Sequence, residues 1–218
     1  CKPLIMSEPS ADTSKAAKGG ETKQENKSKG QVVPSGDKHP LKYQYTFHFL
    51  RRQTGGARFQ DNYEQSVKEI GSFGTVEDFW AYYNHIIRPN DLPYACDYQL
   101  FKKGIKPLWE DDANRNGGKY IIRAPKKKKM ASKWWEDLIL AFIGEQFDVG
   151  DEICGLVVSV RYNEDIFSIW NRNARNEEMK RKIQDVVKSI FGLPETTGLE
   201  YKAHPSAHAN QKDTSHGV

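Results

Sequence analysis

The chain has 218 residues, a length typical of one domain or of one domain with tails. Its net charge is +4, from 33 Lys and Arg against 29 Asp and Glu. This balance permits an anionic ligand, but it is weaker than the basic bias of proteins that hold a long phosphate backbone. The three cysteines (Cys1, Cys96 and Cys154) are odd in number and widely spaced. The sequence therefore predicts neither a disulfide framework nor a zinc site, and it favours a reducing compartment such as the cytoplasm.

Two terminal segments differ in composition from the rest of the chain. Residues 1–38 are rich in Lys, Ser, Gly and Glu and contain almost no large apolar side chains, and residues 204–218 are similar. Such segments bury too little surface to offset their ordering entropy, so we expect both to be disordered tails around a domain at residues 39–203. No apolar run approaches the ~18 residues of a membrane span, so we expect no membrane partner.

The first predicted strand covers residues 41–52. Its aromatic residues (Tyr43, Tyr45, Phe47 and Phe49) alternate with polar ones, and period two with β-favouring side chains is typical of a strand with one buried face.

A loop at residues 53–62 leads towards the first predicted helix, which runs from Thr75 to about Ile87. Thr75 starts a Thr-Val-Glu-Asp string that resembles an N-cap box with Asp78 at its third position, and Pro89 follows the helix.

The remaining elements are mixed strands and helices. Strands are predicted at residues 97–104, 119–125, 152–161, 165–171 and 199–203, and helices at residues 132–147 and 176–191. Because this order lacks regular βαβ alternation, we expect an α+β fold, in which an antiparallel sheet carries the helices on one face. The other face of the sheet is then available for a ligand.

The first two predicted helices are apolar on more than one face. In the first, Phe79 and Tyr83 lie on one stripe and Trp80 lies beside it; in the second, residues 138–143 are apolar throughout. A helix that lies on a sheet needs only one buried stripe. The excess is either part of a deeper core or a surface for a partner helix, and the sequence leaves both open.

The segment at residues 104–123, GIKPLWEDDANRNGGKYIIR, contains Trp109 and Glu110 in a polar stretch after Pro107. An indole in such a loop is not obviously core, although a lone Trp-Glu pair is a weak signal.

With its surroundings, this segment resembles the translation initiation factor 4E family of cap-binding proteins. The matching strings are HPL (39–41), TVEDFW (75–80), CDYQLFKKGIKPLWEDDAN (96–114), GGKYII (117–122), WEDLILAFIGEQF (135–147), ICGLVVSVR (153–161) and SIWN (168–171). They cover about residues 39–203 in order. The resemblance implies a curved antiparallel β-sheet with three helices on its convex face and the 7-methylguanosine cap of messenger RNA bound on its concave face.

The resemblance assigns the base of the cap to four residues. Trp109 and Tyr63 would hold the methylated guanine between their rings, with Phe59 as the alternative to Tyr63. Methylation at N7 makes the base cationic, and a flat cation is favoured between electron-rich aromatic faces. Glu110 would accept hydrogen bonds from N1 and N2 of the base, and Trp170 would pack near the N7 methyl group.

For the phosphates, the resemblance points to Arg161, Lys119 and Arg123. Lys119 stands where the main family has an arginine, and Arg123 resembles a phosphate contact of a divergent branch. Ile166 occupies a position that is basic in the main family. This loss predicts weaker binding of the cap, since one charge-assisted hydrogen bond contributes about 1.5–3 kcal/mol before screening.

Tyr63 stands where the main family has a tryptophan. This departure and the one at Ile166 favour the 4E-homologous branch, which includes a plant-type relative. Its members would occupy caps and restrain selected messages through a repressor partner; a general initiation factor that delivers capped messages to a scaffold is the alternative.

The resemblance also implies that a helix with a Tyr-x-x-x-x-Leu-apolar motif, from a scaffold or repressor protein, docks on the convex side of a monomeric chain. The matching positions are His39, Pro40, Val76, Trp80, Glu136, Ile139, Leu140 and Glu145. Trp80 is the position at which truncation should cost most.

The run Lys126–Lys129 has three open interpretations. It is either a solvated loop, a contact to RNA beyond the cap or a nuclear-entry signal. A generic single-stranded RNA module is a second class of function. A cap hydrolase would need a metal or clustered carboxylates, and the run Glu110, Asp111 and Asp112 is more simply a set of loop charges, so we expect no enzyme, no cofactor and no metal.

Overall fold

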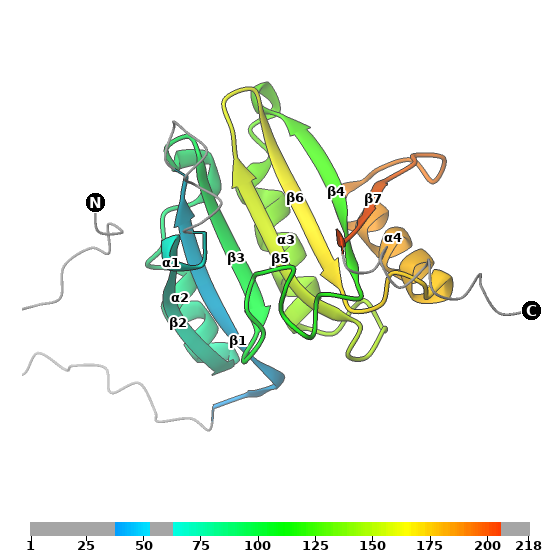
Figure 1. Cartoon of the computed structure of the whole chain (residues 1–218). Coiled ribbons are helices and arrows are strands. Elements are labelled where there is room, and N and C mark those ends of the chain that lie inside the picture. The colour runs from blue at the N-terminus through cyan, green and yellow to red at the C-terminus, as the bar shows by residue number, and fades with distance from the viewer. Residues whose placement is uncertain (1–37, 53–62, 206–218) are drawn as a thin grey trace, which may run out of the picture.

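The computed structural model describes residues 38–52 and 63–205 as one seven-stranded sheet with helices (Figure 1). Its strand order is β2-β1-β3-β5-β6-β4-β7, and every neighbouring pair is antiparallel. The strands are β1 (Pro40–Arg51), β2 (Val67–Thr75), β3 (Cys96–Lys102), β4 (Gly118–Pro125), β5 (Ile153–Val160), β6 (Glu164–Asn171) and β7 (Glu200–Ala203).

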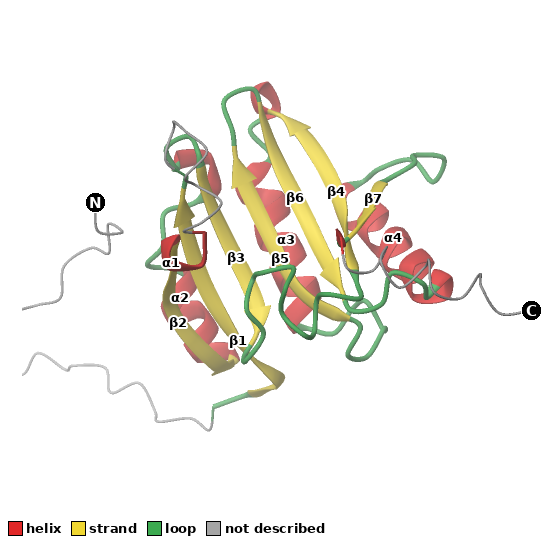
Figure 2. Ribbon diagram, viewed as in Figure 1, coloured by secondary structure: helices red, strands yellow, loops and turns green. Residues whose placement is uncertain are grey.

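Three helices, α2 (Val76–Tyr83), α3 (Ala131–Ile143) and α4 (Glu177–Phe191), cover one face of this sheet (Figure 2). The short helix α1 (Tyr63–Ser66) and the loop between β3 and β4 lie on the opposite face. The prediction of an α+β fold with three helices on the convex face is confirmed.

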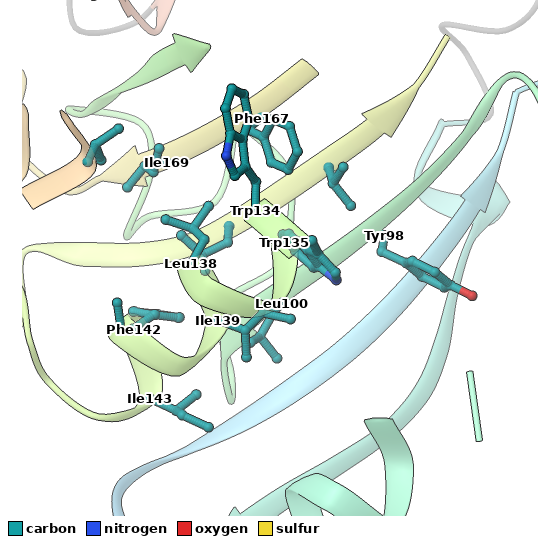
Figure 3. Close-up of a cluster of buried hydrophobic side chains, with 14 of the residues drawn as sticks. Tyr98, Leu100, Trp134, Trp135, Leu138, Ile139, Phe142, Ile143, Phe167 and Ile169 are labelled. Atoms are coloured by element: carbon teal, nitrogen blue, oxygen red, sulfur yellow. The ribbon is translucent and has the colours of Figure 1, made fainter. Parts of the chain in front are cut away.

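The core lies between the sheet and these three helices. Figure 3 shows α3 with Trp134, Trp135 and Phe142 packed over Leu100 and Phe167 from the strands. Burying one such side chain stabilises the fold by about 1.5–3 kcal/mol.

This packing decides between the two interpretations of the apolar helix surfaces. In α3 the run at residues 138–143 is core, because five of its six side chains are buried and Leu140 is half-buried. In α2, Phe79 and Tyr83 are buried, whereas Trp80 remains partly exposed beside them.

The N-cap of α2 is confirmed, since the Asp78 backbone N–H donates to the Thr75 Oγ1 at 3.2 Å. The helix is shorter than predicted and ends at Tyr83 instead of Ile87. The guanidinium of Arg88 donates to the Tyr83 carbonyl oxygen at 2.7 Å and lies over the Tyr83 ring, which satisfies an acceptor at the helix end.

The strand β2 was not predicted. Its apolar residues (Val67, Ile70 and Phe73) are spaced by three, and its pairing with β1 shifts register. At Gly71, an added Cβ would lie 2.4 Å from the ring of Tyr82, so glycine allows α2 to approach this edge strand. A search for strict alternation cannot find such a strand.

The tails and one loop fall outside the described residues. These are residues 1–37, 53–62 and 206–218, so most of both predicted tails and the predicted loop are not described. His204, assigned to the C-terminal tail from the sequence, belongs to the fold: it is buried, and its backbone N–H donates to the Gly117 carbonyl oxygen at 2.9 Å. Within the described ranges, none of the helices has the length and apolar character needed to cross a membrane.

Candidate functional site

The face opposite the large helices has a mixed, partly polar surface. One row of paired residues across five strands reads His48, Gln99, Val157, Ser168 and Ile121. All of these residues except His48 are buried. The polar members distinguish the row from the apolar layer beneath α3 and are typical of a face that is not the main core.

Trp109 is held on this side by a loop with its own hydrogen-bond network. The fully buried Asn114 donates from Nδ2 to the carbonyl oxygens of Lys106 and Leu108 at 2.9 and 2.8 Å. The carboxylate of Asp111 accepts from two backbone N–H groups of the same loop, at 3.0 and 2.9 Å. The Trp109 side chain nevertheless remains 41% exposed. A loop this well bonded fixes the position of an indole that it does not bury.

Tyr63 begins α1 on the same side of the sheet. Its hydroxyl oxygen accepts a hydrogen bond from the Gln99 Nε2 at 3.0 Å, and burial raises the pKa of the phenol. The ring is therefore held as a neutral aromatic surface. Phe59, the alternative partner of Trp109, lies outside the described residues.

An ion pair joins α1 to the loop that carries Trp109. The Lys106 Nζ lies 2.7 Å from the Glu64 Oε1. Between these segments is a cavity of about 190 Å³, lined by His48, Glu64, Val67, Glu69, Lys106, Pro107 and Leu108. The structure thus brings together the segments of Tyr63 and Trp109, which are far apart in the sequence. Glu110 is exposed beside Trp109.

Trp170 lies in a small cluster next to the loop that carries Trp109, since Ile105 and Ala113 of that loop pack against the cluster. Its ring contacts Phe101 edge to face at 5.6 Å and lies 4.5 Å from the His204 ring. The indole is only 8% exposed, and among the described residues no acceptor reaches its buried Nε1.

Lys119 stands over this cluster, with its Nζ 5.2 Å from the Trp170 ring. Burial lowers the pKa of Lys119, and the charges of Arg52 and Lys202 lower it further. Burial also lowers the pKa of His204 to about 4, and Lys119 adds to this effect. His204 is consequently a neutral ring at neutral pH.

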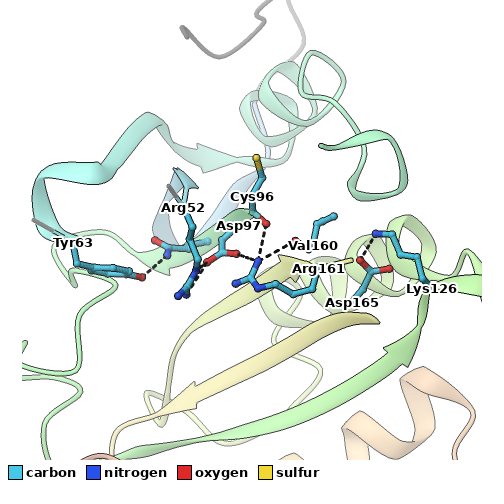
Figure 4. A network of polar contacts seen from close by, with 9 residues as sticks. Arg52, Tyr63, Cys96, Asp97, Lys126, Val160, Arg161 and Asp165 are labelled. Carbon is cyan, nitrogen blue, oxygen red and sulfur yellow. Dashed lines mark hydrogen bonds and ion pairs between the residues drawn. The ribbon is translucent and has the colours of Figure 1, made fainter. Parts of the chain in front are cut away.

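The strongest charge cluster of the face surrounds the fully buried Asp97 (Figure 4). Arg161 Nη1 lies 2.6 Å from one carboxylate oxygen, and Arg52 Nη2 lies 3.1 Å from the other. Arg161 also donates to the Val160 carbonyl oxygen at 3.0 Å. Two guanidinium groups against one carboxylate leave one excess positive charge.

Arg123, the third predicted phosphate contact, is already paired. Its guanidinium lies 2.8 Å from Glu164 and 3.5 Å from Glu200. Its charge is offset, which makes it a poorer phosphate contact than Arg161. Ile166 is its partner on β6 and supplies no charge.

The convex side carries the predicted partner positions. Val76 is 37% exposed, and Trp80 and Leu140 are half-buried. His39 and Pro40 are exposed, and His39 is anchored to α2 because Glu77 accepts from its backbone N–H at 2.9 Å.

The remaining partner positions differ from one another. Glu136 is half-buried, and Glu145 pairs with Lys42 at 2.9 Å. Ile139, predicted as a partner contact, is instead fully buried in the core and offers no surface to a partner.

Sequence reasoning missed three residues of the concave face, namely Arg52, Lys202 and His204. Arg52 and Lys202 carry a visible sequence signal, because each is a basic residue at the end of a strand or in an edge strand. His204 carries no such signal, because it is buried only through its tertiary contact with Trp170.

The chain belongs to the eukaryotic initiation factor 4E family, since residues 40–217 match the model described as Eukaryotic initiation factor 4E. The NCBP initiation factor of Oryza sativa subsp. japonica is 45% identical over 199 residues, which are 91% of this chain and 83% of the relative. Initiation factor 4E-4 of Caenorhabditis elegans is 44% identical over 180 residues, 83% of this chain and 84% of the relative.

Solved structures agree with this assignment. Ascaris suum eIF4E-3 in complex with an m2,2,7G cap matches with a TM-score of 0.71 at 35% identity, over 78% of this chain and 93% of that chain. Caenorhabditis elegans eIF4E-3 in complex with the 4E-binding protein Mextli matches with a TM-score of 0.70 at 36% identity, over 83% of this chain and 97% of that chain. The family and fold expected from the sequence are confirmed.

Proposed function

We propose that this protein binds the 7-methylguanosine cap of messenger RNA on its concave face and regulates translation by binding, without catalysing a reaction. The observation that carries the proposal is Trp109. Its indole is 41% exposed although the surrounding loop is fixed by internal hydrogen bonds. A fixed indole with an open face is ready to stack against a flat ligand.

The base fits the groups around this indole. A methylated guanine is a flat cation, and Trp109 and Tyr63 supply neutral aromatic faces on one side of the sheet. The adjacent carboxylate Glu110 accepts from the N1 and N2 donors and adds favourable charge. An unmethylated guanine lacks the cation–π contribution and should bind less tightly.

The phosphates would meet the excess positive charge around Asp97. Arg161 and Arg52 are held there by the buried carboxylate, so little side-chain order is lost on binding. Lys119 adds a second cation near Trp170. The cluster suits a short phosphate chain better than a long nucleic-acid backbone.

Within the family, the chain fits a 4E-homologous regulator better than a general initiation factor. Tyr63 replaces a tryptophan, Ile166 lacks a charge, and the charge of Arg123 is offset by Glu164 and Glu200. The changes at Ile166 and Arg123 weaken phosphate binding, which suits a factor that acts on selected messages in the cytoplasm together with a partner.

The partner would be a helix of the Tyr-x-x-x-x-Leu-apolar type, docked on Val76, Trp80 and Leu140. The complex of Caenorhabditis elegans eIF4E-3 with Mextli supports this proposal by relationship. Partly exposed apolar anchors on adjacent helices are the surface that helix-in-groove docking requires.

Tryptophan fluorescence titration with 7-methyl-GTP and with GTP tests the function. We expect clear preference for the methylated nucleotide and loss of that preference in Trp109→Ala. The matched control Trp80→Ala, on the opposite face, should keep it. Equal affinity for both nucleotides in the unaltered protein would exclude cap recognition and favour a generic single-stranded RNA module.

A further inference from the structure

An exposed pair of tyrosines lies at the end of the sheet where β5 turns into β6. Tyr94 precedes β3 and Tyr162 follows β5, and their rings contact edge to face at 5.2 Å. They are 54% and 74% exposed, more than any other large apolar or aromatic side chain of the described residues. Neither the cap site nor the partner surface uses them.

The lysine run Lys126–Lys129 lies against this pair. The Lys126 Nζ is 5.7 Å from the Tyr94 ring, and its charge is offset by the buried Asp165 at 2.6 Å (Figure 4). The next three lysines are exposed, and within the described part of the chain they form no ion pair. Asp91, shortly before Tyr94 in the sequence, is an exposed acidic residue near this pair. We call Tyr94, Tyr162, Lys127 and Lys128 the tyrosine–lysine edge.

Hydrogen bonds fix the three segments that form this edge. The Lys126 backbone N–H donates to the Asn163 carbonyl oxygen at 3.2 Å, which ties the lysine run to the β5–β6 turn. The Asn90 side chain donates to the Lys129 carbonyl oxygen at 2.9 Å, which ties the run to the turn before Tyr94. A ligand would therefore meet a surface that is already ordered.

The edge is continuous with the phosphate end of the candidate site. Tyr162 directly follows Arg161, and β1 and β5 end on this side of the sheet, which places Arg52 and Arg161 there too (Figure 1). A nucleotide chain that leaves the cap phosphates at Arg161 meets the tyrosine–lysine edge next.

We propose that the tyrosine–lysine edge binds the first nucleotides of single-stranded RNA that follow the cap. This proposal rests on the proposed function, because the cap site determines where the RNA begins. Exposed aromatic rings stack on bases regardless of sequence, and ammonium groups beside them attract the intervening phosphates. The edge combines both groups, which an isolated solvated lysine loop does not.

The test compares 7-methyl-GTP with a capped RNA of about eight nucleotides. The intact protein should bind the capped RNA at least about fivefold more tightly, as expected for one or two stacked bases. Tyr94→Ala/Tyr162→Ala should remove this gain and leave the 7-methyl-GTP affinity unchanged. Lys127→Ala/Lys128→Ala should reduce the slope of log affinity against log salt for the RNA by about 1.4, at ~0.7 per charge.

Lys68→Ala/Arg181→Ala is the matched control, because both residues are exposed and lie on β2 and α4, away from this edge. It should keep the RNA gain and the salt slope. Equal binding of capped RNA and 7-methyl-GTP by the intact protein would overturn the proposal, as would a gain that survives the tyrosine double variant. A protein that does not prefer 7-methyl-GTP over GTP would instead overturn the proposed function.

Discussion

Ile166 shows how one residue can set the strength of a charged site. It sits on the concave side of β6 opposite Arg123, whose charge is offset by two carboxylates. We expect Ile166→Lys to tighten 7-methyl-GTP binding about fivefold, since a partly screened charge-assisted contact contributes about 1 kcal/mol. Isothermal titration calorimetry measures the change. Ile166→Met, which adds no charge, should bind as the original does, and a lysine variant without tightening would falsify the weak-grip argument.

His204 is a second residue whose environment has a measurable effect. Its pKa of about 4 in the fold lies below the ordinary 6.5. The unfolded chain therefore binds the proton more readily than the folded chain. The contribution of neutral His204 to the free energy of unfolding is complete above pH 6.5 and is lost as the pH falls towards 4. Between about pH 7 and pH 5 the loss should be roughly 2 kcal/mol.

Urea denaturation of the wild type and His204→Gln at several pH values measures this contribution. The difference in unfolding free energy between the two should shrink as the pH falls through that window. His85→Gln, at an exposed site, should follow the wild-type profile. A difference that does not vary with pH would show that His204 acts only through packing.

At the scale of elements, the loop between β3 and β4 determines whether Trp109 is presented. Asn114→Ala removes both side-chain hydrogen bonds to the loop backbone. We expect at least a tenfold loss of 7-methyl-GTP affinity, because the indole is no longer fixed before the ligand arrives. Asn90→Ala removes one comparable bond in a different loop and should leave nucleotide affinity intact. Equal affinity in the two variants would contradict the role of the loop.

Gly117 joins that loop to β4 and tests the packing of the same element. An added Cβ would lie 1.8 Å from the Asn171 carbonyl oxygen, a backbone atom that cannot turn aside. Gly117→Ala should lower the free energy of unfolding by about 3 kcal/mol or more. Gly198→Ala, with no atom within 4 Å of its added Cβ, should be close to neutral. Thermal unfolding of both variants gives the comparison.

The elements also show what the sequence could predict. Strands such as β1 and the Thr75 cap of α2 follow from local alternation and capping chemistry, and both were predicted. The strand β2 was not, because its two glycines and register shift serve tertiary contacts. In the same way, Trp109 was found from its polar surroundings, whereas His204 lies against Trp170 only because the chain returns there after β7.

At the scale of the whole molecule, the sheet separates two surfaces. The candidate cap site lies on one face, and α2 and α3 present Val76, Trp80 and Leu140 on the other. Trp80→Ala should reduce binding of a Tyr-x-x-x-x-Leu-apolar peptide by roughly 2 kcal/mol or more and leave 7-methyl-GTP affinity unchanged. Fluorescence anisotropy with a labelled peptide measures the first effect. Loss of both activities in a folded variant would show that the faces are not independent.

A single sheet with a ligand site on each face has a kinetic consequence for any partner docked on α2 and α3. When both messenger RNA and the partner are bound, the partner lies on the opposite face of the sheet from the 5′ end of the RNA. Its second contact, with the message or with a factor on it, then becomes intramolecular and is governed by an effective concentration that tether length sets. When the cap leaves the site, a message still held through the partner can rebind rapidly. Modest affinity for the cap therefore allows long occupancy of selected messages.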